Sequence, residues 1–208
     1  SSGLQGQSID VASYRLAIHL TLAFSIIGLI CWYILLSVKS TQDLMLARRS
    51  QESKLVRLCN IFLGLLFLQI ILGALVAGIG AGQSYNDWPL MGGEVFPSDY
   101  LEYTPLYLNL LDNPASVQFN HRIVGYFSFV LAIFIWFKSR KSPLKTVKRK
   151  TDIMVMAVFL QIFLGILTVL YSATLQLAIL HQLMALILFI TVIRARFEVT
   201  YPTKQVLV

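Results

Sequence analysis

The sequence has little of what a water-soluble protein uses. Only 13% of its 208 residues are charged, 57% are apolar, and the mean hydropathy is +0.72. Its two cysteines are too few for a disulfide-rich secreted scaffold. A nucleic-acid-binding domain and a disordered chain are excluded as well, because both need a far more polar composition. The composition is that of an integral membrane protein.

Long apolar runs make up about half of the chain. A helix needs about 20 apolar residues to cross the hydrocarbon core of a bilayer. We therefore expect an all-α integral membrane protein with five transmembrane helices. They are predicted at Leu16–Val38, Leu58–Gly80, Val117–Phe137, Ile153–Tyr171 and Leu175–Ile193.

Basic residues are absent from one long loop. Residues 81–116, here called the acidic loop, contain five acidic residues, four of the six prolines and no Lys or Arg. Two basic loops, residues 39–57 and 138–150, carry five and seven Lys or Arg. Because basic loops stay on the cytoplasmic or matrix side, we predict the acidic loop and the N-terminus outside and the C-terminus inside. The net charge of +7 therefore reflects topology, with the lipid bilayer and no nucleic acid as the partner.

The chain contains two pairs of similar segments. Phe67–Gly73 nearly matches Phe159–Gly165, and Leu16–His19 resembles Leu177–His181 apart from one inserted residue. The first match, which includes a Gln, is equally typical of polar packing between membrane helices. The second match includes a histidine, which indicates an internal repeat of helices.

The start of the sequence indicates missing upstream helices. Residues 1–10 are polar and lack an initiator Met and a signal-peptide pattern, although the topology begins outside with an odd number of spans. We expect residues 1–57 to be the last helix of a truncated N-terminal half plus a basic inner loop. Residues 58–208 are expected to form a complete antiparallel four-helix bundle.

All three histidines lie inside predicted helices, at similar depths near the outer ends: His19, His121 and His181. Ionisable residues within a membrane are costly and usually functional. His121 and His181 lie on the second and fourth helices of the predicted bundle, where their side chains converge. Two imidazoles suffice to hold haem iron, whereas a bare zinc or copper ion needs three or four ligands. The alternative is that each histidine only forms a hydrogen bond across helices.

Small residues follow each histidine by one helical turn. They are Ala23, Gly125 and Ala185, which leave flat space for a porphyrin beside each candidate ligand. Arg122 points to a different side of the helix from its neighbour His121. Either it binds a haem propionate or it reaches out to the membrane surface. Similarly, Tyr85–Gly93 is either a cap over the bundle or an ordinary surface loop.

Five strings of residues resemble the haem A synthase family in its alphaproteobacterial and mitochondrial form. They follow the family order through nearly the whole chain: Tyr14–Leu20, Leu68–Gly78, Tyr85–Met91, Val117–Arg122 and Leu180–Gln182. The family has eight helices in two pseudo-symmetric halves, each with a histidine pair. The chain resembles the last five helices of that arrangement.

The resemblance implies an oxidoreductase that oxidises the C8 methyl of haem O to a formyl group, giving haem A for terminal oxidases. It implies that His121 and His181 hold a b-type haem for electron transfer. It also makes His19 a candidate axial ligand of the substrate haem, with its partner upstream, so this chain alone lacks a complete active site.

The resemblance further implies a bacterial plasma membrane or a mitochondrial inner membrane as the location. Haem O is the expected substrate, haem O synthase and an electron acceptor are candidate partners, and a homo-oligomer is left open. Asp87 stands where the family pattern has Thr, and the acidic loop has no cysteine. The alternative function is a non-catalytic b-type cytochrome module that transfers electrons.

Overall fold

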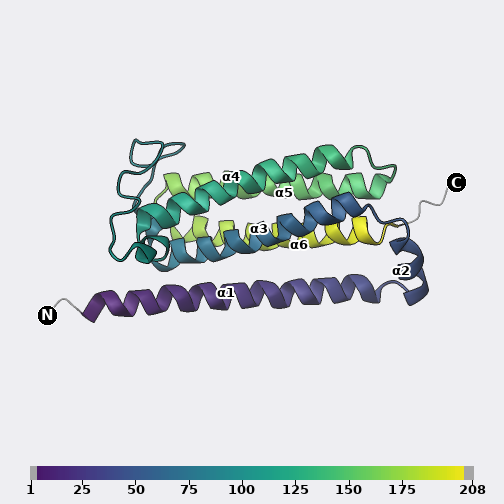
Figure 1. Cartoon of the computed structure of the whole chain (residues 1–208), viewed down its shortest axis with the longest axis horizontal. Helices are drawn as coiled ribbons and strands as arrows, with labels where there is room; N and C mark the ends of the chain where they lie inside the picture. The colour runs from purple at the N-terminus through teal and green to yellow at the C-terminus, as the bar shows by residue number, and fades with distance from the viewer. Residues whose placement is uncertain (1–3, 204–208) are drawn as a thin grey trace. The chain divides into compact units, whose positions relative to one another are not determined.

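The protein consists mainly of long α-helices joined by loops (Figure 1). The computed structural model describes the backbone of residues 4–203 and the side chains of residues 13–203. Within residues 4–203 the structure has no β-strand, only an isolated bridge between Met91 and Glu94. The α-helices are α1 (Leu4–Ser37), α2 (Thr41–Arg48), α3 (Ser53–Gly78), α4 (Pro114–Ser139), α5 (Lys145–Leu170) and α6 (Leu175–Thr200). Two short 3-10 helices, η1 (Ala81–Gln83) and η2 (Leu106–Leu110), lie in the acidic loop.

Five of these helices are long and apolar enough to cross a membrane: α3, α4, α5, α6 and residues Ser13–Ser37 of α1. The predicted all-α membrane fold is confirmed, and the chain is a multi-pass membrane protein. Several helices extend beyond the apolar segments that predicted them. For example, α5 begins at Lys145 rather than Ile153, because Lys and Arg favour helix as strongly as most apolar residues.

Helix α2 lies in the first basic loop and was not predicted. The Ser40 side chain accepts a hydrogen bond from the Asp43 backbone N–H at 3.1 Å, which caps the start of the helix. Asp43 lies in the first turn and Arg48 in the last, where each charge stabilises the helix dipole. This short helix is therefore specified by its ends and not by an apolar stripe.

The chain divides into two compact units, each made of parts of all five long helices. The acidic-loop unit contains the chain up to Ala23, Phe67–Tyr126 and Ile162–Gln182, and it includes all three histidines. The basic-loop unit contains Phe24–Leu66, Phe127–Gln161 and the chain from Leu183 onwards. This division runs across the helices, so the predicted segments 1–57 and 58–208 stay a prediction.

Within the acidic-loop unit, α1 packs against α3 at close range. A Cβ added to Gly78 would lie 2.7 Å from the Ser13 Cα, so only glycine fits there. Ala17, Ala74, Leu75 and Val117 form a buried cluster that joins α1, α3 and α4. Small side chains thus let the helices approach closely where lipid supplies no hydrophobic driving force.

Within the basic-loop unit, α1 packs against α6 through aromatic rings. Phe24 and Phe189 meet edge to face with their centroids 5.4 Å apart. Trp32 packs edge to face on Phe197 at 5.3 Å, and the Arg196 guanidinium lies 4.4 Å from the Trp32 ring centroid. These contacts fix α1 to α6 by shape and by a cation–π interaction.

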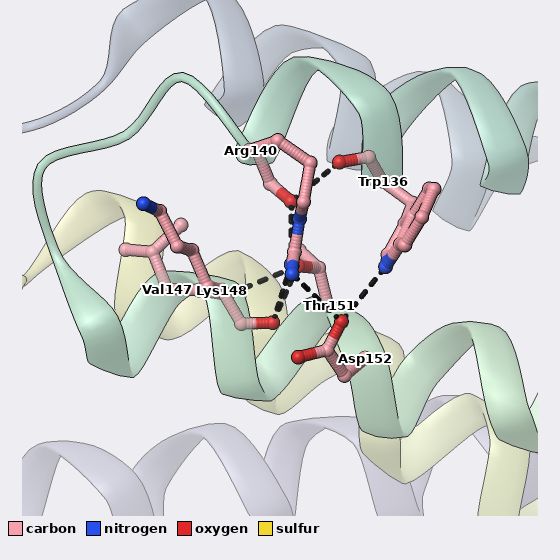
Figure 2. A network of polar contacts seen from close by, with 7 residues as sticks. Trp136, Arg140, Val147, Lys148, Thr151 and Asp152 are labelled. Atoms are coloured by element: carbon pink, nitrogen blue, oxygen red, sulfur yellow. Dashed lines mark hydrogen bonds and ion pairs between the residues drawn. The ribbon is translucent and has the colours of Figure 1, made fainter.

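Arg140 closes the turn between α4 and α5 in the same unit (Figure 2). Its guanidinium forms an ion pair with Asp152 at 3.0 Å and donates to the Lys148 carbonyl at 2.8 Å and the Thr151 hydroxyl at 3.0 Å. The Trp136 indole donates to the same Asp152 carboxylate at 2.7 Å. The second basic loop is therefore a turn held by hydrogen bonds and an ion pair.

Candidate functional site

His121 on α4 packs directly against α3. A Cβ added to Gly73 would lie 3.0 Å from the His121 Cε1, so the ring lies on the bare backbone of α3. The Gln69 amide donates to the His121 carbonyl at 3.0 Å, and its nitrogen lies 3.2 Å from the His121 Nε2. The His121 Nδ1 is buried and has no hydrogen-bond partner among the described residues. One ring nitrogen is thus held by α3 while the other is unsatisfied.

His181 on α6 packs against α5 in the same way. A Cβ added to Gly165 would lie 3.0, 3.5 and 3.8 Å from the His181 Cε1, Nδ1 and Nε2. The corresponding distances from Gly73 to His121 are 3.0, 3.6 and 3.9 Å. Each glycine ends one of the two matched segments, and each faces the histidine of the following helix. This equivalence favours an internal repeat over chance similarity of apolar helices.

The structure brings His121 and His181 into the same unit, near enough to interact electrostatically. His19 lies on α1 in the same unit, with its side chain exposed. The described part of the chain contains no group of three or more His, Cys, Asp or Glu side chains placed to hold a metal ion. The donor set that the structure offers is a pair of imidazoles.

The space beside Gly125 receives a side chain of α3, and the predicted room for a porphyrin there stays a prediction. A Cβ added to Gly125 would lie 3.4 Å from the Gln69 amide nitrogen. The absence of a side chain at Gly125 therefore leaves room for the Gln69 amide, which in turn reaches His121. The matched segment Phe67–Gly73 predicted only polar packing between helices and did not connect Gln69 to the histidine.

Comparison of the sequence with known proteins identifies the family of the chain. Residues 1–193 match the model of the COX15-CtaA family, described as cytochrome oxidase assembly protein. The chain belongs to this family. It is 48% identical over 202 residues to a protein of Dinoroseobacter shibae named heme A synthase, covering 97% of this chain and 53% of that protein. It is 50% identical over 204 residues to heme A synthase of Ruegeria pomeroyi, covering 97% and 54%.

A third relative, heme A synthase of Paracoccus denitrificans, is 45% identical over 201 residues, with 97% of this chain and 53% of that protein covered. The predicted membership of the haem A synthase family is confirmed. The chain spans about half the length of the curated relatives that it matches. No solved structure is significantly similar to it.

In this member of the COX15-CtaA family, Arg122 binds the acidic loop. Its guanidinium donates to the Leu90 carbonyl at 2.8 Å, to the Tyr85 carbonyl at 3.3 Å and to the Gln118 side-chain oxygen at 3.4 Å. Neither of its two predicted partners, a propionate or the membrane surface, is needed to explain its position. A role toward a propionate stays a prediction.

The acidic loop is ordered by its own polar groups. The Tyr85 hydroxyl donates to the Asp99 carboxylate, and burial together with this bond raises the pKa of Tyr85 to about 12. The backbone N–H groups of Gly93 and Gly92 donate to the Asp87 carboxylate, both at 2.8 Å, and hold its pKa below the ordinary value. Gly92 and Gly93 have positive φ, +65° and +78° respectively, which a residue with a side chain rarely adopts. Asp87 thus shapes this turn.

Proposed function

We propose that the chain is part of a haem A synthase, an oxidoreductase that oxidises the C8 methyl of haem O to a formyl group. The relatives named heme A synthase support this proposal, since three of them are 45–50% identical to this chain over nearly its whole length. The observation that carries the proposal to particular residues is the equivalent packing of His121 on Gly73 and His181 on Gly165.

The two histidines are proposed to hold a b-type haem. Two neutral imidazoles are a haem donor set, and they are too few for a bare zinc or copper ion. The buried, unsatisfied Nδ1 of His121 shows that the ring has hydrogen-bonding capacity that the protein does not use. When bound, the haem would supply one-electron transfer between the substrate site and an electron acceptor.

The residues around His121 have definable roles in this proposal. Gly73 lets the imidazole approach the backbone of α3, which fixes the ring plane. The Gln69 amide holds the ring and the His121 carbonyl, so the histidine is oriented before any ligand arrives. Orientation in advance lowers the ordering cost of binding.

His19 is proposed as an axial ligand of the substrate haem, completed by a histidine outside this chain. The proposed substrate is haem O, and the proposed partners are haem O synthase, an electron acceptor and a further copy of the protein. The proposed orientation has the acidic loop outside and the C-terminus inside a bacterial plasma membrane or mitochondrial inner membrane, because of the charge asymmetry of the loops. The second candidate function is a non-catalytic b-type cytochrome, which the histidine pair alone would also support.

Haem analysis of cells that express the full-length gene tests the proposal. We expect extracts to contain haem A, and the purified protein to show a low-spin b-type spectrum. His19→Ala should abolish haem A formation and keep the b-type spectrum, whereas His121→Ala combined with His181→Ala should abolish that spectrum. Failure of the unmodified protein to make haem A from haem O would leave only the cytochrome function, and survival of the b-type haem in the double variant would refute the ligand assignment.

A further inference from the structure

Three polar side chains form a stripe along α4 at intervals of one helical turn, and all three bind one segment of the acidic loop. Gln118 donates to the Tyr85 carbonyl at 3.2 Å. Arg122 donates to the carbonyls of Tyr85 and Leu90. The Tyr126 hydroxyl accepts a hydrogen bond from the Trp88 indole at 3.2 Å. The segment Tyr85–Leu90 therefore lies along α4 and not above its end.

The stripe extends well into the membrane-spanning helix. At about 1.5 Å per residue, Arg122 and Tyr126 lie about 12 and 18 Å from the start of α4 at Pro114. Helix side chains lean toward the N-terminus, so the bound segment lies somewhat nearer the helix end than these positions do. The packing of His121 on Gly73 gives an independent measure, since Gly73 lies about 8 Å inside the end of α3 at Gly78. The segment thus descends below the ends of both helices.

Backbone without regular structure is tolerated at membrane depth only where its polar groups are satisfied by protein or line a water-filled cavity. Here the carbonyls of Tyr85 and Leu90 accept from α4, and the N–H groups of Gly92 and Gly93 donate to Asp87. The charge of Arg122 is close enough to the Asp87 carboxylate for the two to interact. Two carbonyls of the segment and the turn that follows it are therefore paired within the protein.

Two apolar side chains of the segment are exposed. Trp88 is 42% exposed and Leu90 is 39% exposed, whereas the next residue, Met91, is 2% exposed. The only hydrogen-bond donor of the Trp88 side chain is already bonded to Tyr126. The surface that Trp88 presents is consequently hydrocarbon, and it suits a lipid environment better than water.

We propose that Tyr85–Leu90 is a re-entrant segment, anchored by Gln118, Arg122 and Tyr126, that inserts Trp88 and Leu90 among the acyl chains of the leaflet where α4 begins. Its partner is the lipid bilayer itself. This proposal concerns depth and does not rest on the proposed haem chemistry or on the side of the membrane. It assigns Arg122 a structural charge within the membrane, compensated inside the protein.

Tryptophan fluorescence in lipid vesicles tests the depth. The full chain is reconstituted into phosphatidylcholine vesicles with or without bromine on the acyl chains, and the signal of Trp88 is obtained as the difference from Trp88→Phe. We expect bromolipid to quench this difference signal more strongly than aqueous iodide does. Dominant quenching by iodide would show a solvated loop and overturn the proposal. Protection from both quenchers would show that protein covers Trp88, which would also overturn it.

Arg122→Gln tests the anchor. We expect the Trp88 signal to lose bromolipid quenching and to gain iodide quenching. Arg140→Gln is the matched control, because Arg140 is anchored as fully as Arg122 but to the turn between α4 and α5, and it should leave the Trp88 signal unchanged. If Arg122→Gln fails to fold, judged by gel filtration, Tyr126→Phe removes only the bond to Trp88 and should shift the signal in the same direction. An unchanged signal in a folded anchor variant would refute the stripe as the anchor.

Discussion

The helix pair α3 and α4 and the pair α5 and α6 share one packing device but differ in how they are joined. In each pair a glycine one turn after a glutamine receives a histidine ring at 3.0 Å. Residues 79–113, most of the acidic loop, join the first pair, whereas residues 171–174 join the second. The packing of the histidines therefore does not require the long loop. The loop is an addition to one copy of the device, and it brings the anchor at Arg122 with it.

The largest effect should come from filling the space that a glycine leaves for the histidine ring in each helix pair. Gly73→Val and Gly165→Val each place side-chain atoms where the histidine ring lies, which costs about 1–3 kcal/mol by overpacking. We expect both variants to lose the b-type spectrum to a similar extent. Gly64→Val is the control, since nothing lies within 4 Å of a Cβ at Gly64. A large loss in one variant and none in the other would show that the two copies are not equivalent.

Replacing Gln69 should affect the histidine of the first helix pair, His121, without filling the space at its glycine. Gln69→Leu removes a donor to the His121 carbonyl and a contact with its ring, worth about 1 kcal/mol for an ordinary hydrogen bond. We expect it to shift the reduction potential of the bound haem while the protein stays folded, as measured by a redox titration. Gln69→Asn, which keeps the amide donor on a shorter side chain, should restore the ring orientation in part. An unchanged potential in Gln69→Leu would limit Gln69 to helix packing.

Acid should loosen the long connection and leave the short one intact. The pKa of Asp87 is held below the ordinary value of 3.8 by the amides of Gly93 and Gly92, so the carboxylate stabilises the folded loop at neutral pH. This contribution is present above pH 4 and is lost as the pH falls through the lowered pKa. We expect the Trp88 difference signal to become accessible to iodide below about pH 4. Asp87→Asn should remove the transition, and a transition that survives in Asp87→Asn would assign it to another carboxylate.

The smallest effect should come from the turn between α4 and α5. Arg140→Gln breaks a half-exposed ion pair with Asp152 and the hydrogen bonds to the Lys148 carbonyl and the Thr151 hydroxyl, and it leaves the Trp136 bond to Asp152 in place. Exposed ion pairs contribute about 0–1 kcal/mol, and water can reach this half-exposed turn to replace the lost hydrogen bonds, so the thermal stability should fall only slightly. A thermal melt followed by circular dichroism measures this, and a fall as large as that of Gly73→Val would contradict the ranking.

Sequence patterns predicted the five membrane helices because apolar runs of about 20 residues have few other uses. They predicted the family from strings such as Tyr85–Met91 and Val117–Arg122. They did not predict that Gln69 contacts His121 or that Arg122 binds the acidic loop. Membrane helices are apolar on most sides, so their sequence says little about how each is rotated against its neighbours.

One signal for the loop anchor was available and was missed. Gln118, Arg122 and Tyr126 are polar residues spaced by four in an apolar helix, and such a stripe indicates one polar face. The glycine that meets the His121 ring, in contrast, gave no signal in the sequence, because Gly73 lies on another helix. The space for a porphyrin beside Gly125 stays a prediction.

Because α1 approaches α3 closely at Ser13 and Gly78, the positions of two histidines, His19 and His121, both depend on α3. His19 lies about 9 Å along α1 from Ser13, and Ala17 between them packs with Ala74. The same stretch of α3 receives the His121 ring at Gly73. The helix that carries His19 and the ring of His121 therefore both pack on α3, and a tilt of α3 would displace both imidazoles together.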